Sequence, residues 1–234
     1  MKKNILLILF VTVAGASVLL TGCSKDNTTT TDTTSPVITL TGSASIDIPL
    51  NSSAWTDLLG TATDNVDGYG LLVTSNASSS NPNVNRSGTY IITYTATDKA
   101  GNVGQATRSI RVYNEAEIFA GNYNNSVDTC VSTPPSGFNA TVTLSDSINR
   151  LVKVKNFGAF GVAVYVWVTI TGNTNGSAIT LSNGQSLGGN AQISSVYPLV
   201  TKVISGNSTS TSFFIKYGWT DGSSSDVCET TYTR

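Results

Sequence analysis

The feature that most limits the fold of this chain is a segment in which apolar and polar side chains alternate. From Tyr90 to Thr97, the residues Tyr90, Ile92, Tyr94 and Ala96 fall on one face of an extended strand, and three threonines fall on the other. This period of two is that of a β-strand with one buried side. After Cys23 we find no amphipathic helical pattern longer than about two turns. The sequence therefore predicts an all-β fold.

Composition supports this prediction and excludes several functions. Charged residues make up 12% of the chain, against about 25% in an average domain. Ser, Thr, Asn and Gly, which compete with helical hydrogen bonding, take their place. The chain has no histidine, which excludes Ser-His-Asp and Cys-His catalysis and His-based zinc sites. The net charge of -1 leaves no basic footprint for a nucleic acid partner.

The N-terminus has the parts of a secretion signal. Lys2 and Lys3 precede an apolar run that ends in Leu20-Thr21-Gly22-Cys23. The run alone approaches the length of a transmembrane helix, but the basic start and the small residues favour a signal peptide. Leu-Thr-Gly-Cys resembles the lipobox of bacterial lipoproteins. The resemblance implies a lipoprotein signal peptide over residues 1–22, cleavage before Cys23 and lipidation of the Cys23 thiol.

Residues 23–35 are expected to form a disordered, Thr-rich tether, because they offer no apolar side chain to bury. The Ser24-Lys25-Asp26 segment resembles the charged export signal of Bacteroidetes surface lipoproteins. That resemblance implies an outer-membrane protein, anchored by its lipid and exposed at the cell surface. The periplasmic face of that membrane is the alternative.

Residues 36–114 carry the motifs of one domain. They are Pro36-Val37-Ile38-Thr39-Leu40, Ala62-Thr63-Asp64-Asn65-Val66-Asp67-Gly68, Gly88-Thr89-Tyr90 with the strand that follows, and Ala100-Gly101-Asn102. The pattern resembles the bacterial Ig-like domains of surface proteins, including the type first named in a pesticidal crystal protein. The resemblance implies a Greek-key β-sandwich that serves as a spacer and binding scaffold. Tyr90 is the candidate for a tyrosine corner.

Residues 115–234 form a second series of short β-branched and aromatic runs, separated by turns such as Asn183-Gly184 and Asp221-Gly222. The series predicts an antiparallel meander, and whether it forms a sandwich or a barrel stays open. Its two ends, Phe119 to Tyr123 and Cys228 to Tyr232, resemble the C-terminal β-domains of Bacteroidetes surface lipoproteins of unknown role. Cys130 and Cys228 have no CxxC spacing and belong to an oxidising compartment, so we predict that they form a disulfide.

Two groups of side chains are candidates for ligand binding. Asp64, Asp67 and Asp98 could gather oxygens around a calcium ion, or could cap turns through the backbone. The aromatic pairs Tyr165–Trp167 and Tyr217–Trp219 each lie at i and i+2, so both rings of a pair share one face of a strand. Such rings suit stacking on sugars, and they suit core packing equally.

These observations predict a membrane-anchored extracytoplasmic lipoprotein that is not an enzyme. It would act as a non-catalytic binding module for a glycan or a partner protein at the cell surface. The alternative is a structural accessory subunit of an envelope complex with no ligand of its own. A glycan-active enzyme comes third, because no pair of carboxylates stands out as an acid and a base. No cofactor other than calcium is suggested.

Overall fold

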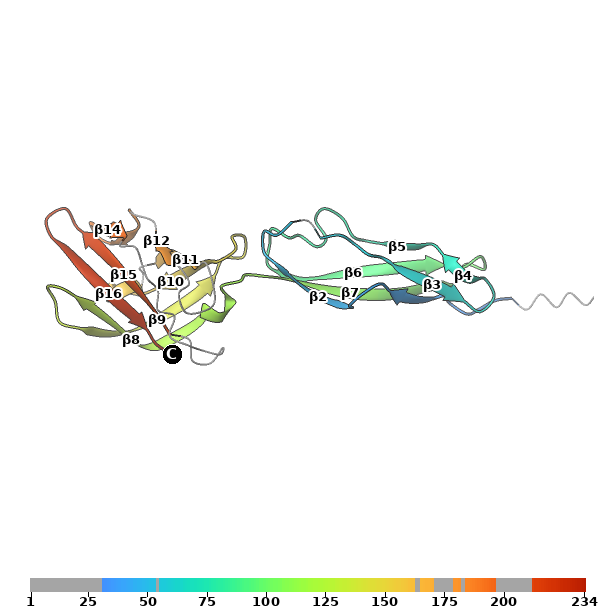
Figure 1. Ribbon diagram of the computed structural model, residues 1–234, viewed down its shortest axis with the longest axis horizontal. Coiled ribbons are helices and arrows are strands. Elements are labelled where there is room, and N and C mark those ends of the chain that lie inside the picture. Colours follow the sequence, from blue (N-terminus) through green and yellow to red (C-terminus); the bar gives the residue numbers. More distant parts are fainter. Residues whose placement is uncertain (1–30, 54, 163–164, 171–178, 182–183, 197–211) are drawn as a thin grey trace, which may run out of the picture. The chain divides into compact units, whose positions relative to one another are not determined.

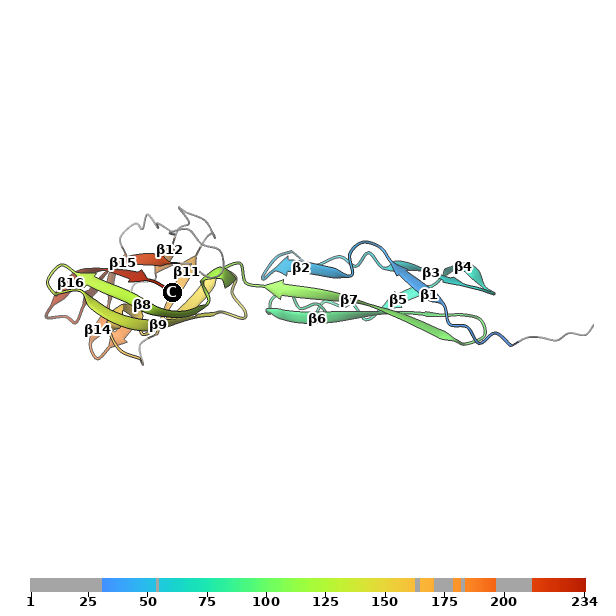
Figure 2. The ribbon, with the colours of Figure 1, turned by 90° about the horizontal axis from the view of Figure 1, so that it is seen from below.

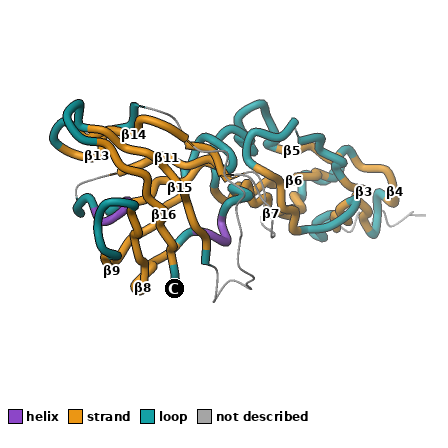
Figure 3. Tube along the Cα trace, turned by 60° about the vertical axis from the view of Figure 1, so that its left-hand side comes forward, coloured by secondary structure: helices purple, strands orange, loops and turns teal. Residues whose placement is uncertain are grey.

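The structure is a computed structural model that describes residues 31–53, 55–162, 165–170, 179–181, 184–196 and 212–234. Among these residues every regular element is a β-strand, apart from two single-turn 3₁₀ helices, η1 (Glu117–Phe119) and η2 (Phe157–Ala159). Figure 3 shows how strands dominate the trace. The all-β prediction is confirmed. The expected signal peptide, Cys23 and most of the expected tether lie outside the described residues.

The first part of the chain forms two facing β-sheets. In spatial order, one sheet contains β1 (Val37–Leu40), β3 (Gly60–Asp64) and β4 (Gly68–Leu71), and the other contains β2 (Ser45–Pro49), β7 (Val103–Tyr113), β6 (Gly88–Thr97) and β5 (Val73–Ser75). Strands β2 and β7 pair in parallel, and the other pairs are antiparallel. Figures 1 and 2 both show β6 and β7 running side by side over their lengths. These two strands are the central pair of the four-stranded sheet.

The alternation of β6 decides which of its side chains enter the core. Ile92, Tyr94 and Ala96 are buried, whereas Ile91 on the other face is half exposed. The buried residues pack with Ile110 of β7 in one apolar cluster. The Tyr90 hydroxyl donates a hydrogen bond of 2.8 Å to the carbonyl oxygen of Arg86. The predicted tyrosine corner is therefore present.

The second part forms a single sheet of nine antiparallel strands. In spatial order these are β12 (Ile179–Leu181), β11 (Tyr165–Ile170), β10 (Leu151–Lys155), β9 (Ser136–Leu144), β8 (Gly121–Cys130), β16 (Ser225–Tyr232), β15 (Phe213–Thr220), β14 (Ala191–Val196) and β13 (Ser186–Gly188). Strands that follow one another in the sequence are neighbours in the sheet, as the predicted meander requires, except that β12 and β13 lie at its two opposite edges. In addition, the first strand, β8, pairs with the last, β16.

This sheet curls until its two ends approach each other. Strands β11 and β13 lie close together although they pair with different neighbours. Gln185, just before β13, accepts a hydrogen bond of 2.7 Å from the Trp167 backbone N–H and donates one of 3.0 Å to the Trp167 carbonyl oxygen. Its side-chain amide thus takes the place of a neighbouring strand at this point. The sequence left open whether this domain is a sandwich or a barrel. The structure has one curled sheet and not two packed sheets.

The inside of the curled sheet is filled by aromatic side chains. Phe213 stacks on Tyr232 at 4.6 Å between ring centroids, and Tyr123 meets Phe213 edge to face at 5.2 Å. All three are fully buried. The Tyr123 hydroxyl donates to the carbonyl oxygen of Phe119 at 2.8 Å, so the buried polar group is satisfied. This packed interior leaves the outer face of the sheet and the loops for ligands.

Candidate binding site

The outer face of β11 presents two aromatic rings to solvent. Val168 on the inner face is fully buried, whereas Tyr165 and Trp167 are each 43% exposed. Alternation along a strand turns both rings to the same side, about 7 Å apart. The strand thus holds two flat apolar surfaces in a row on an otherwise polar face. Val162, which precedes β11, is 71% exposed.

A lysine from the neighbouring strand completes this surface. The Lys153 ammonium lies 4.0 Å from the centroid of the Tyr165 ring and 5.8 Å from that of the Trp167 ring. A cation over a ring face is attracted by the ring quadrupole. The backbone N–H and carbonyl oxygen of Trp167 are bonded to the Gln185 side chain, and Trp167 lies opposite Lys153 of β10. The surface formed by Tyr165, Trp167 and Lys153 is called the outer aromatic face below.

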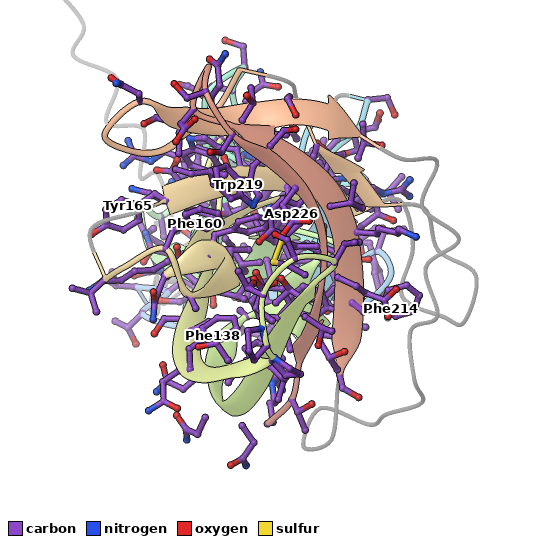
Figure 4. The ribbon with its side chains drawn as sticks, turned by 90° about the vertical axis from the view of Figure 1, so that its left-hand side faces the viewer. Phe138, Phe160, Tyr165, Phe214, Trp219 and Asp226 are labelled. Carbon is purple, nitrogen blue, oxygen red and sulfur yellow. A yellow bond between two sulfur atoms is a disulfide. The ribbon has the colours of Figure 1, made fainter. Side chains whose placement is uncertain are left out.

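The second aromatic pair faces the other way. Tyr217 is fully buried and packs against Phe157 at 4.8 Å between ring centroids. Trp219 is half buried and meets Phe160 edge to face at 5.8 Å. In Figure 4, Trp219 and Phe160 lie next to each other, whereas Tyr165 lies at the edge of the domain. The prediction of a ligand-binding role is wrong for Tyr217 and is not supported for Trp219, because the curl of the sheet turns this face of β15 inward.

Cys130 and Cys228 form the predicted disulfide. They are directly opposite each other on β8 and β16, with 3.9 Å between their Cα atoms. Cys228 is buried in the core. The bond therefore fastens the first strand of the curled sheet to the last, at the one place where neighbours in the sheet are far apart in the sequence.

Beside the disulfide lies a buried carboxylate that the sequence analysis did not single out. Asp128 is 6% exposed. It accepts hydrogen bonds from the Thr230 hydroxyl and, at 3.3 Å, from the Tyr217 hydroxyl. Burial raises the pKa of Asp128, and these two hydrogen bonds oppose the rise. Its partners are core side chains, so Asp128 belongs to an internal polar network between β8, β15 and β16.

Of the three acids predicted as calcium ligands, Asp64 and Asp98 come together, whereas Asp67 pairs with a lysine. Asp64 accepts a hydrogen bond of 3.0 Å from the backbone N–H of Asp67, and this and other backbone hydrogen bonds lower its pKa. The Asp67 carboxylate instead receives the Lys99 ammonium at 2.8 Å, and Asp98 receives the backbone and side-chain N–H groups of Asn102. Asp64 and Asp98 have oxygens within 4.8 Å of each other. The three carboxylates thus stabilise turns, and Asp67 already has a cation.

A cavity of about 290 Å³ in the Ig-like part is lined by Trp55 and Asp57 among others. Burial by itself raises the pKa of Asp57, but hydrogen bonds from Ser75 at 2.6 Å and Tyr94 at 2.7 Å, with the Arg108 charge at 3.6 Å, bring the pKa below its usual value. Both carboxylate oxygens of Asp57 therefore already have partners within the domain. In the sequence, Trp55-Thr56-Asp57 is the motif that could have indicated this cluster. The cluster is part of the domain's interior.

The protein thus consists of a β-sandwich followed by a curled β-sheet, and the outer aromatic face lies on the curled sheet. Residues 38–112 match the family model described as bacterial surface protein, Ig-like domain. The match confirms the predicted Ig-like domain and indicates an extracytoplasmic protein of the cell envelope. A search of curated proteins gives no match. Among the described residues, no helix has the length and apolar character needed to cross a membrane.

One solved structure similar to this chain is that of the lipoprotein BT2262 from Bacteroides thetaiotaomicron. The alignment has 15% sequence identity and a TM-score of 0.33, and it covers 84% of this chain and 99% of the other.

Proposed function

We propose that this protein is a non-catalytic binding module, anchored in the outer membrane through lipid on Cys23 and displayed at the cell surface, and that it binds a glycan on the outer aromatic face. The observation that carries the proposal is the exposure of Tyr165 and Trp167, each 43%, on one face of a fixed strand. Tyr and Trp are common anchors in binding sites because they offer a large rigid surface at low cost in conformational entropy.

The geometry of the face suits an extended carbohydrate. Residues at i and i+2 stand about 7 Å apart along a strand, which allows each ring to stack on a different sugar of one chain. The strand itself is held in place, because Val168 is buried and both backbone polar groups of Trp167 are bonded to Gln185. A preformed platform pays little ordering cost on binding.

A second candidate function is that of a structural accessory subunit in an envelope complex. The observation that favours it is a group of exposed apolar side chains in the Ig-like part. Tyr69 is 91% exposed, Leu72 79% and Val66 67%, on or next to the edge strand β4. Exposed apolar groups of this kind often mark contacts with another protein.

The test compares single substitutions in each surface. The full chain in detergent micelles is applied to a glycan array, and Trp167→Ala is compared with Tyr69→Ala as the matched control. We expect Trp167→Ala to weaken glycan binding by at least about tenfold with little change in melting temperature, because the ring is on the surface. Tyr69→Ala should leave glycan binding unchanged.

Full binding by Trp167→Ala would refute a role for the outer aromatic face and direct attention to the loops. Absence of any glycan ligand, together with loss of a co-purifying envelope protein in Tyr69→Ala, would favour the accessory subunit.

A further inference from the structure

The distribution of charge along the chain is uneven around the outer aromatic face. Between Asp146 and Asp221 the sequence contains no aspartate or glutamate, but five basic residues: Arg150, Lys153, Lys155, Lys202 and Lys216. This stretch therefore has a formal charge of +5, although the chain as a whole has a net charge of -1. It includes β10, β11 and β12, so no carboxylate stands on these strands.

The register of the sheet brings two of these lysines into line with the two rings. Lys153 lies opposite Trp167 and Lys155 lies opposite Tyr165 in the pairing of β10 with β11. Directly opposite residues in an antiparallel pair point to the same face. Thr143 and Thr141 of β9 continue the two rows. Each row thus presents a hydroxyl group, an ammonium group and an aromatic ring.

These two lysines have no acid partner in the part of the chain that the structure describes, where the ion pairs involve other residues. Arg150, by contrast, is paired with Glu115 at 3.0 Å, and Lys216 lies opposite Glu229 in the pairing of β15 with β16. Among the basic residues of this stretch that the structure describes, those with no acid opposite them, Lys153 and Lys155, therefore lie beside Tyr165 and Trp167. The Lys153 ammonium contacts the faces of the Tyr165 and Trp167 rings instead of an acid.

We propose, on the basis of the glycan-binding function above, that the ligand is an anionic polysaccharide. Its carboxylate or sulfate groups bind Lys153 and Lys155, and its sugar rings stack on Tyr165 and Trp167. A cation–π contact at an exposed site is weak, whereas a charge-assisted hydrogen bond to an anion is stronger. The Lys153 ammonium therefore moves from the rings to the anion when the ligand binds, which uncovers the rings for stacking.

The test is a titration of the full chain in detergent micelles by calorimetry. Three polymers are compared: polygalacturonate, which carries carboxylates, chondroitin sulfate, which also carries sulfates, and neutral dextran. We expect at least one anionic polymer to bind more tightly than dextran, with an affinity that falls as salt is added. A double substitution, Lys153→Gln with Lys155→Gln, should weaken this binding by at least about tenfold. Lys216→Gln, with the same change on another strand, should have little effect.

The outcomes separate this inference from the function on which it rests. Dextran bound as tightly as the anionic polymers and lost in Trp167→Ala would overturn the anionic ligand and leave glycan binding intact. Equal weakening by Lys216→Gln, or equally tight binding of a DNA oligonucleotide, would show a general attraction for polyanions and overturn the inference. If none of the polymers binds, both proposals fail for these ligand classes.

Discussion

Removal of the Cys130–Cys228 disulfide should destabilise the curled sheet strongly and leave the Ig-like domain unchanged. The bond joins residues 98 positions apart. For a closed loop of this length the chain-entropy model gives about 5 kcal/mol of stabilisation, by restricting the unfolded chain. The residues are also direct cross-strand neighbours, so the bond holds the pairing of β8 with β16 that closes the meander. The effect should fall entirely on the core that contains Cys228.

The assay is calorimetry of the wild type, with and without reductant, and of a double variant, Cys130→Ala with Cys228→Ala. The apolar core of the Ig-like domain runs from Ile38 to Ile110 and shares no residue with the other core, so we expect two transitions. About 5 kcal/mol corresponds to a fall of roughly 20 °C for a unit of about 120 residues. Only the C-terminal transition should move, and the Ig-like transition serves as the internal control.

Two results would refute this reasoning. One is a shift of only a few degrees, which would mean that the unfolded chain is already restricted without the bond. The other is a single transition that moves as a whole under reductant, which would mean that the two cores unfold as one cooperative unit. Unchanged labelling of both cysteines by a thiol reagent before and after reduction would show that the bond is absent in solution.

Two further predictions concern Asp128 and the membrane anchor. Burial raises the pKa of Asp128, so its ionised form costs stability at neutral pH, and this cost disappears as the pH falls below the unfolded value of about 3.9. Asp128→Asn should therefore be more stable relative to the wild type at pH 7 than at pH 3.5 in urea unfolding, and a pH-independent difference would contradict this. Cys23→Ala should leave an unprocessed, unacylated precursor, and detergent phase separation should show the mature wild type in the detergent phase. A variant that is still cut at the same site and still carries lipid would contradict the lipobox interpretation.

The parts of the fold that could be predicted from the sequence are those set by local patterns. Ile92, Tyr94 and Ala96 alternate with threonines, and burial follows that alternation along β6. The tyrosine corner at Tyr90 depends on a turn only four residues away. The disulfide could be predicted because one thiol was assigned to lipid and two remained. Each of these inferences needs only sequence order and simple chemistry, with no knowledge of the topology.

Strand β8 escaped prediction because, of its buried residues, only Tyr123 is aromatic and the others are polar. Its sequence is rich in asparagine, and an irregularity between Tyr123 and Ser126 shifts its register. After this bulge the buried positions are Ser126 and Asp128. A polar residue can occupy such a position only when its partners are supplied, and the partners of Asp128 come from β15 and β16. They are some 90 to 100 residues away, so a local pattern cannot reveal them.

The two aromatic pairs show that a local sequence pattern is equally limited as a guide to the binding site. Tyr165–Trp167 and Tyr217–Trp219 have the same spacing, and both strands alternate, so the sequence offers two equivalent candidates. The curl of the sheet separates them, because β15 turns its rings into the closed interior and β11 turns its rings outward. Charge also differs between them: the outward pair has Lys153 and Lys155 across the strand pair, whereas the inward Tyr217 has the Asp128 carboxylate. A search for a surface platform in a similar chain should therefore look for alternating aromatics whose cross-strand neighbours are polar on the same face, since core positions rarely accept unpaired lysines.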